Sequence, residues 1–137
     1  MPPGVVVEPF LGGGGPLPVD YKIFVFGGRA ACVKVDRDRE HAHRLAYYGL
    51  DWQRICAPEG WRDPPPPRSL DKMIAAAEQL GRGFDFVRAD FYEVDGRPRF
   101  GELTFYPGSG LNPLPREFDY RLGAQWAEAR ERRLAEG

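Results

Sequence analysis

Residues 85–106 read DFVRADFYEVDGRPRFGELTFY, and the way in which this stretch folds decides the rest of the chain. Asp95 and Gly96 stand between two runs rich in apolar residues, which is a strong short-range signal for a β-hairpin. The stretch carries four side chains suited to polar chemistry: Arg88, Asp90, Glu102 and Thr104. Whether these four meet depends on the register of the hairpin, because a shift of one residue moves a side chain to the other face of the sheet.

A two-residue turn at Asp95 and Gly96 is the first of two possible registers. It places Asp90 opposite Gly101, and Glu102 then projects from the other face of the sheet. No pair of acidic side chains meets in this register. A site in the hairpin therefore requires the longer loop.

A three-residue loop over 94–96, with Gly96 in the left-handed region, is the second register. It pairs Asp90 with Phe100 and Arg88 with Glu102, so that the four polar side chains share one face. The opposite face collects Val87, Ala89, Phe91, Leu103 and Phe105. Because a sheet with one buried face separates apolar from polar side chains, we expect the three-residue loop.

Asp90 and Glu102, held side by side, would repel each other unless a proton, an arginine or a divalent cation lay between them. Hard oxygen ligands favour magnesium, which needs only one or two carboxylates when waters and substrate phosphates complete its shell. The alternative is a cross-strand ion pair between Arg88 and Glu102, with Asp90 in solvent. The hairpin alone leaves both interpretations open, and for an arbitrary hairpin the ion pair is the commoner.

The composition fits one domain that is short for a complete enzyme with several substrates. The chain has 137 residues, and 19 basic against 20 acidic side chains give a net charge of −1. This balance gives no electrostatic case for nucleic acid or a membrane surface. Cys32 and Cys56 have no metal-binding or disulfide spacing, which fits a reducing cytoplasm. We expect no signal peptide and no membrane insertion.

Other segments predict more strands. Residues 4–8, GVVVE, predict a short buried strand that ends before the glycines at 12–15. Residues 19–27 and 30–36 flank Gly27 and Gly28 and predict a second hairpin. Residues 36–52 show no clear period and are expected to form a loop, either solvated or anion-binding.

Two segments predict helices. Leu70, Met73, Ile74, Ala77 and Leu80 recur at helical spacing after Ser69 and before Gly81. Residues 115–134 predict a second helix with Leu122, Trp126 and Ala129 facing inward. Residues 58–68 are rich in proline and predict a surface connector. The fold class expected is α+β, with a largely antiparallel sheet covered by helices.

Five motifs occur in an order that resembles the C-terminal half of an ATP-grasp ligase domain, in particular the TupA-like group, which is named for teichuronopeptide synthesis and found among cell-surface polysaccharide genes. They are VVVEPFL (5–11), LPVDYKIFVFGG (17–28), VKVDRDREHAHR (33–44), FDFVRADFYEVDG (84–96) and FGELTFYPGSG (100–110). The likeness covers about 5–122 and leaves 123–137 as a helical tail. It implies one partial ATP-grasp domain over 1–137.

The resemblance implies a ligase that uses ATP and Mg2+ to activate a carboxylate as an acyl-phosphate, which an amine then attacks. The substrates would be small molecules, glycans or peptides. Asp90 and Glu102 would hold the metal with Thr104, which stands where most ATP-grasp enzymes have asparagine, and Lys22 and Arg88 would act on phosphates or the acyl-phosphate. Four residues would contact the nucleoside, with Asp20 at the ribose: Glu8, Phe10, Leu11 and Asp20. Four basic residues would suit an acidic acceptor: Arg37, Arg39, His43 and Arg44.

Family members also have an N-terminal domain and a lid with phosphate-binding lysines, and this sequence starts after them. We therefore expect the chain to be inactive alone and to need a partner that supplies that half. The alternative is a non-catalytic remnant of the fold that binds nucleotide or another protein. Nucleic-acid binding through 37–44 is a third hypothesis, which the near-neutral charge disfavours.

Overall fold

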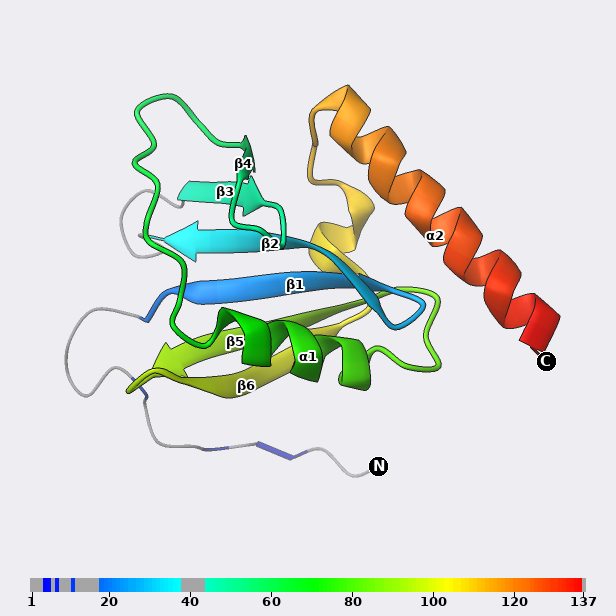
Figure 1. The fold of residues 1–137 in the computed structure, drawn as a ribbon, viewed down its shortest axis with the longest axis horizontal. Coiled ribbons are helices and arrows are strands. Elements are labelled where there is room, and N and C mark those ends of the chain that lie inside the picture. The colour runs from blue at the N-terminus through cyan, green and yellow to red at the C-terminus, as the bar shows by residue number, and fades with distance from the viewer. Residues whose placement is uncertain (1–3, 6, 8–10, 12–17, 38–43, 137) are drawn as a thin grey trace.

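The computed structural model describes residues 4, 5, 7, 11, 18–37 and 44–136. In this part of the chain, six strands form one antiparallel sheet in the order β4-β3-β2-β1-β5-β6, accompanied by two α-helices and one 3-10 helix (Figure 1). The elements are β1 (Asp20–Phe26), β2 (Arg29–Arg37), β3 (Arg44–Tyr48), β4 (Arg54–Cys56), α1 (Leu70–Leu80), β5 (Val87–Val94), β6 (Arg97–Thr104), η1 (Pro107–Gly110) and α2 (Arg116–Glu136). The predicted α+β class, with an antiparallel sheet covered by helices, is confirmed.

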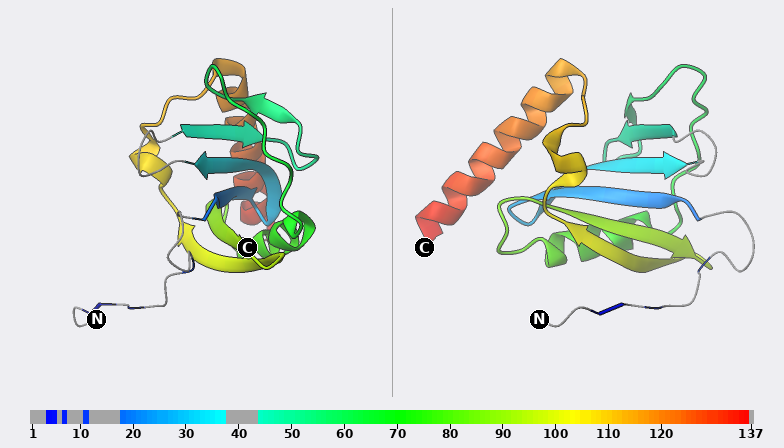
Figure 2. Two further views of the ribbon diagram at one scale, coloured as in Figure 1. Left: turned by 90° about the vertical axis from the view of Figure 1, so that its left-hand side faces the viewer. Right: turned by 180° about the vertical axis from the view of Figure 1, so that it is seen from behind.

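The two faces of the sheet have separate cores. Tyr21, Ile23 and Val25 alternate along β1 and pack on the side of α1, whereas Phe24 and Phe26 point to the other side. Figure 2 shows α1 on one side of the sheet and η1 on the other. On that second side three side chains of α2 pack against Phe24 and Phe26 of β1. They are Phe118, Leu122 and Ala129. The second hairpin and both predicted helices are therefore present.

The hairpin of 85–106 closes with a two-residue turn, so the predicted three-residue loop is wrong. Val94 pairs with Arg97, and both turn residues have positive φ, 54° at Asp95 and 68° at Gly96. Such a turn matches the right-handed twist of the flanking strands, which is why Asp-Gly favours it. The turn chemistry decides the register here, and the segregation of apolar residues does not.

A β-bulge at Gly101 nevertheless brings the predicted residues together. The register shifts between Asp90 and Phe91, so that Asp90 lies opposite Glu102 and Phe91 lies opposite Phe100. The predicted pairings of Asp90 with Phe100 and of Arg88 with Glu102 are therefore also wrong, since Arg88 lies opposite Thr104. The extra residue on β6 cancels the inversion that the two-residue turn would cause. Asp90 and Glu102 thus share a face, as expected, for a reason that the sequence analysis did not include.

A short strand lies where the sequence predicted a loop, since β3 falls within 36–52. A second short strand, β4, follows just after this range. Tyr47 and Tyr48 are both buried, one on each side of the sheet, so this strand shows no alternation of polar and apolar residues. A strand covered on both faces lacks the period on which the prediction depended.

The buried strand predicted at 4–8 is also wrong at the positions that the structure describes. Val5 and Val7 lie outside any strand, and their side chains are 89% and 88% exposed. The β-branched run predicts strand propensity, but propensity forms no strand without a neighbour that provides pairing.

α1 begins after Ser69 and ends before Gly81, as predicted, but Ser69 does not cap it with its side chain. The backbone N–H and the hydroxyl of Ser69 both donate to Glu93 Oε2, at 2.7 Å each. These two bonds fix the start of α1 to β5. In α2, Leu122 and Ala129 are buried as predicted, whereas Trp126 is 42% exposed and lies against Phe86, with ring centroids 4.9 Å apart.

Candidate functional site

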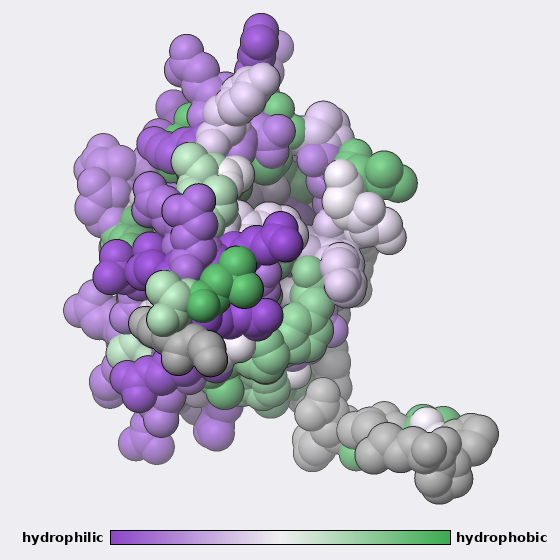
Figure 3. Space-filling view, turned by 90° about the vertical axis from the view of Figure 1, so that its right-hand side faces the viewer, coloured by the Kyte–Doolittle hydropathy of each residue, from purple (hydrophilic) through white to green (hydrophobic). Residues whose placement is uncertain are grey.

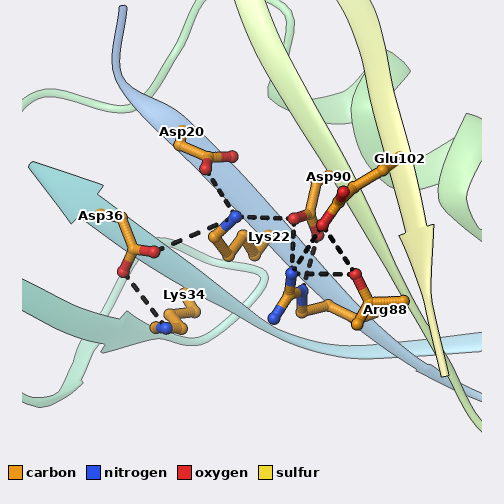
Figure 4. A network of polar contacts seen from close by, with 8 residues as sticks. Asp20, Lys22, Lys34, Asp36, Arg88, Asp90 and Glu102 are labelled. Atoms are coloured by element: carbon orange, nitrogen blue, oxygen red, sulfur yellow. Dashed lines mark hydrogen bonds and ion pairs between the residues drawn. The ribbon is translucent and has the colours of Figure 1, made fainter. Parts of the chain in front are cut away.

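The face of the sheet opposite α1 carries a row of polar side chains across five strands. Strand pairing sets Tyr47 beside Lys34, Lys34 beside Lys22, Lys22 beside Asp90, and Asp90 beside Glu102. Arg88 and Thr104 form the next cross-strand pair on the same face, two residues further along β5 and β6. Figure 4 shows the charged members of these pairs pointing toward one another above β1, β2, β5 and β6. We call the set of Asp20, Lys22, Lys34, Asp36, Arg88, Asp90, Glu102 and Thr104 the polar network.

Asp90 is the centre of the polar network and is only 2% exposed. Arg88 donates to both of its carboxylate oxygens, from Nε to Oδ1 and from Nη2 to Oδ2, each at 2.7 Å. Lys22 Nζ donates to Oδ2 at 2.6 Å. Two cations therefore offset the penalty of burying this carboxylate, since charge-assisted and bidentate hydrogen bonds are among the strongest.

Lys22 joins the acids of three strands. Its ammonium also donates to Asp20 at 2.5 Å and lies 4.0 Å from Asp36, which forms an ion pair with Lys34 at 3.3 Å. Burial lowers the pKa of Lys22, but the hydrogen bonds to Asp20 and Asp90 raise that pKa by more, so it lies above the ordinary value. Lys22 therefore stays charged at neutral pH.

Arg88 links the buried side of the network to the exposed side. Its Nη2 donates to Thr104 Oγ1 at 3.0 Å and to Glu102 Oε1 at 3.3 Å, and the Thr104 hydroxyl donates to the same Glu102 oxygen at 2.9 Å. Burial lowers the pKa of Arg88, but its bonds to Asp90 raise that pKa overall. The ion pair between Arg88 and Glu102 thus exists, but Asp90 is not the solvated residue that the simpler interpretation required.

The donor set fits a magnesium ion held jointly with a phosphate chain. Asp90 and Glu102 are direct cross-strand partners, the side chain of Glu102 is 64% exposed, and Thr104 lies beside it. Two carboxylates do not make a complete protein cage, and among the described residues no group of three or more potential ligands gathers in metal-binding geometry. Magnesium bound through one or two carboxylates plus phosphates and waters needs no such cage.

The other predicted site residues divide into three groups. Asp20 belongs to the polar network and is buried. Leu11 is described and partly exposed, whereas Glu8, Phe10, Arg39 and His43 lie outside the described residues.

Arg37 and Arg44 lie on the opposite face of the sheet from Asp90. They pair across β2 and β3, and their guanidinium carbons lie 5.9 and 5.8 Å from the ring centroid of Trp61, which packs on the core beneath α1. Arg44 also donates to the backbone carbonyl of Glu59 at 2.8 Å. These contacts hold the proline-rich connector against the sheet, and the polar network contains neither arginine.

The sequence analysis missed Lys34 and Asp36 as members of the polar network. Both alternate with Val33 and Val35 along β2, which is the pattern of a strand with one charged and one apolar face. Pairing that strand with β1 from the turn at 27–28 alone would have set Val33 beside Lys22, and the register shift between Phe24 and Val25 is what sets Lys34 there. The alternation was visible in the sequence, whereas the register was not.

Comparison with known proteins agrees with this geometry. Residues 17–127 match the TupA-like ATP-grasp family. This chain belongs to that family. No curated protein matches the sequence.

Among solved structures, the D-alanine–D-alanine ligase of Bacillus anthracis resembles this TupA-like protein with a TM-score of 0.50 and 18% sequence identity. The match covers 88% of this chain and 42% of that enzyme. At this identity the likeness concerns the fold, and the TupA-like chain spans less than half the length of the ligase. In the part that the structure describes, no helix is both long and apolar enough to cross a membrane.

Proposed function

We propose that this TupA-like chain is the metal-binding part of an ATP- and Mg2+-dependent carboxylate–amine ligase. The observation that carries the proposal is the placement of Asp90 opposite Glu102, with Arg88 and Lys22 on the same face. Phosphoryl transfer depends on positioning and on stabilising charge more than on a nucleophilic side chain. The polar network offers carboxylates for a metal and cations for phosphates on one surface.

In this proposal Asp90 and Glu102 would hold Mg2+, and the bound ion would neutralise negative charge on the phosphates. Thr104 acts through Glu102: its hydroxyl donates to Oε1, and in this proposal Oε2 would bind the metal. The hydroxyl thus takes the place of the asparagine found in most ATP-grasp enzymes by orienting a ligand.

Lys22 and Arg88 are the proposed cationic residues at the phosphates and at the acyl-phosphate. Their raised pKa values keep both charged throughout the physiological range. A substrate carboxylate attacks the terminal phosphorus of ATP with loss of ADP, and an amine then displaces phosphate to form the amide. We assign the ribose to Asp20 and the adenine to the segment of Glu8, Phe10 and Leu11, following the resemblance.

We infer that residues 1–137 act as one partial ATP-grasp domain and that turnover requires the half of the fold that carries the lid. The proposed setting is the cytoplasmic synthesis of cell-surface polysaccharide or teichuronopeptide. The family match and the 42% coverage of the ligase chain support this inference.

Calorimetric titration with ATP, in the presence and absence of Mg2+, tests the proposal. We expect magnesium-dependent binding, and we expect Asp90→Asn and Glu102→Gln each to weaken it by about tenfold or more, because each removes one of two charged ligands. Glu128→Gln, which removes an exposed carboxylate on α2, is the matched control and should bind normally. The ligase proposal fails if no magnesium-dependent binding occurs even when a candidate N-terminal half is supplied.

The second candidate is a non-catalytic remnant of the fold. One observation favours it: Arg88 and Lys22 already satisfy both oxygens of Asp90, so the network is stable without a metal. A remnant predicts that ATP binding, if present, does not depend on magnesium. The same titration therefore separates the two functions.

A further inference from the structure

A cavity of about 300 Å3 lies beside Arg88, between the sheet, η1 and α2. Seven aromatic side chains dominate its lining, and we call it the aromatic pocket: Phe24, Phe26, Tyr47, Phe86, Phe105, Tyr106 and Trp126. The first four are buried, whereas the last three are exposed to differing degrees. The floor is therefore apolar and fixed, and the entrance opens to solvent.

Two buried cations form one wall of the aromatic pocket. Lys34 and Arg88 both line the cavity and are both at most 7% exposed. Their partners in the polar network, Asp36 and Asp90, do not line it. The pocket thus presents two cations at one side, mostly aromatic and apolar side chains elsewhere, and a single acid, Asp119, on α2. Two cations against one acid, together with the aromatic rings, complement a molecule with one anionic end and one apolar end.

Gly123 contributes empty space to the aromatic pocket. It lies within α2 and lines the cavity, and a Cβ at this position would meet no heavy atom of another described segment within 4 Å. A glycine inside a helix lowers stability by roughly 0.5–1 kcal/mol relative to alanine. Neither backbone geometry nor close packing requires glycine here, and its effect is to leave the helix side of the cavity open.

The aromatic pocket lies beyond the proposed phosphate position, at the other end from the ribose. Asp20 starts β1 and Phe26 ends it, and six steps along a strand of about 3.3 Å each separate them by about 20 Å. Lys22 stands near the ribose end and Arg88 pairs with Phe24 between the two. A nucleotide that runs from Asp20 to Arg88 leaves the pocket free.

We propose that the aromatic pocket binds the carboxylate substrate and that this substrate carries a planar apolar group, such as an aromatic ring. The inference rests on the proposed function for the direction of the nucleotide. The ring lies among Phe26, Phe86 and Trp126, and the carboxylate lies at Lys34 and Arg88, next to the metal-binding acids. Aromatic contacts select the ring, and the two cations select the anion.

A broad protein-docking face is not needed to explain these aromatic side chains. On the side of the molecule shown in Figure 3, hydrophilic residues cover most of the surface, and hydrophobic ones form small, separate areas. The volume of about 300 Å3 lies at the lower end of small-molecule sites. A small ligand is therefore the occupant that we propose.

NMR titration with 3-phenylpropanoate tests the inference, with Trp126 as reporter because its indole N–H lies at the rim and donates to Asp85 at 3.3 Å. We expect saturable shifts of the Trp126 indole and of the amides of Gly110 and Gly123. Propanoate, which lacks the ring, and 3-phenylpropan-1-ol, which lacks the charge, should each bind about tenfold more weakly. Equal affinity for all three probes, or no shifts at Trp126, would overturn the inference.

Filling the pocket gives a second test. Gly123→Leu should weaken 3-phenylpropanoate by about tenfold, because Gly123 lines the cavity and a large side chain there would take up its space. Ala124→Leu, on the next and exposed position of α2, is the matched control and should bind as the unchanged chain does. If folded Gly123→Leu binds 3-phenylpropanoate as tightly as the unchanged chain does, the assignment of this ligand to the aromatic pocket is contradicted. The comparison of the three probes uses the unchanged chain and therefore does not depend on the folding of a variant.

Adenosine and MgATP separate this inference from the proposed function. Adenosine that displaces 3-phenylpropanoate from Trp126 would show that the pocket takes the nucleoside, and would overturn the inference. MgATP that binds normally to Gly123→Leu supports it. If 3-phenylpropanoate binds but MgATP does not, even when a candidate N-terminal half is supplied, the ligase proposal fails while the ligand class of the pocket stands.

Discussion

The hairpins β1–β2 and β5–β6 are built alike and do different things. Both close with a two-residue turn of positive φ, at Gly27 and Gly28 in the first and at Asp95 and Gly96 in the second. Both contain one register shift. In β1–β2 the shift lies near the turn, between Phe24 and Val25, and borders the aromatic pocket, whereas in β5–β6 it lies in the middle of the polar network.

The position of the bulge decides how much of each hairpin the turn alone describes. In β1–β2 the bulge decides that Lys34 lies opposite Lys22, where pairing counted from the turn would set Val33. At Gly101 it decides whether Glu102 faces Asp90 or faces away. The difference teaches that a register deduced from the turn alone describes only the part of a hairpin between the turn and the first bulge.

The largest effect is expected from removing the buried carboxylate of Asp90 in the second hairpin. Asp90→Ala leaves Lys22 and Arg88 buried without their shared partner, which should lower the free energy of unfolding by about 3–5 kcal/mol. Urea denaturation measures this loss. Glu102→Gln, at an exposed carboxylate, serves as control and should lose less than about 1 kcal/mol. A loss at Asp90 no larger than that of the control would contradict the account of the network.

The two turns should differ in their tolerance of a methyl group. Both Gly27 and Gly96 have positive φ, but a Cβ at Gly27 would lie 3.0 Å from the Cβ of Ala129, whereas at Gly96 its nearest neighbour is the flexible Arg68, at 3.7 Å. We expect Gly27→Ala to lose about 2 kcal/mol and Gly96→Ala about 1 kcal/mol. Thermal denaturation of the pair measures the difference, and equal losses would show that α2 does not press on the first turn.

The hydrogen bonds from Ser69, at the start of α1, to Glu93 on β5 should stabilise the fold to an extent that depends on pH. Burial raises the pKa of Glu93, but the hydrogen bonds from Ser69 lower it by more, so its folded pKa lies below the ordinary 4.5. The stabilising contribution is present above pH 4.5 and is lost as the pH falls through the lowered pKa. Glu93→Gln should lose about 1 kcal/mol at neutral pH and less in acid. A loss that stays constant down to acid pH would exclude this ionised bond.

The smallest effect is expected from removing the bulge without changing the pairing. Deleting Gly101 leaves Phe100 opposite Phe91 and Glu102 opposite Asp90 in a regular ladder. Magnesium-dependent ATP binding should then change by less than about threefold. The matched double deletion of Arg99 and Gly101 sets Glu102 opposite Phe91, on the other face of the sheet, and should abolish that binding. Loss of binding on deletion of Gly101 would show that the bulge itself, and not the pairing, positions Glu102.

The sequence predicted both hairpins because their turns carry a local chemical signal. It did not give the correct loop length at Asp95 and Gly96, because the segregation of apolar residues was used to choose it and one face of this sheet is mixed. Gly101 stood alone in a strand pattern, which is itself a signal for a bulge. Attention to that glycine would have given the right register for the right reason.

The candidate site was predictable as far as it depended on β5 and β6, since Arg88, Asp90, Glu102 and Thr104 lie on one hairpin. The contribution of β2 to the network, and of α2 to the aromatic pocket, depends on contacts between distant segments. Lys34 and Trp126 meet the cavity only once the sheet order and the path of α2 are known. Periodicity within one segment does not contain that information.

The charge balance of the polar network has a consequence for the order in which ligands bind. Three buried acids face three buried bases: Asp20, Asp36 and Asp90 against Lys22, Lys34 and Arg88. A divalent cation alone would raise the positive potential beside Lys22, and a free polyphosphate would raise the negative potential beside Asp90. We expect the two to bind synergistically, each lowering the dissociation constant of the other, so that the protein takes up the preformed magnesium–nucleotide complex in preference to either component.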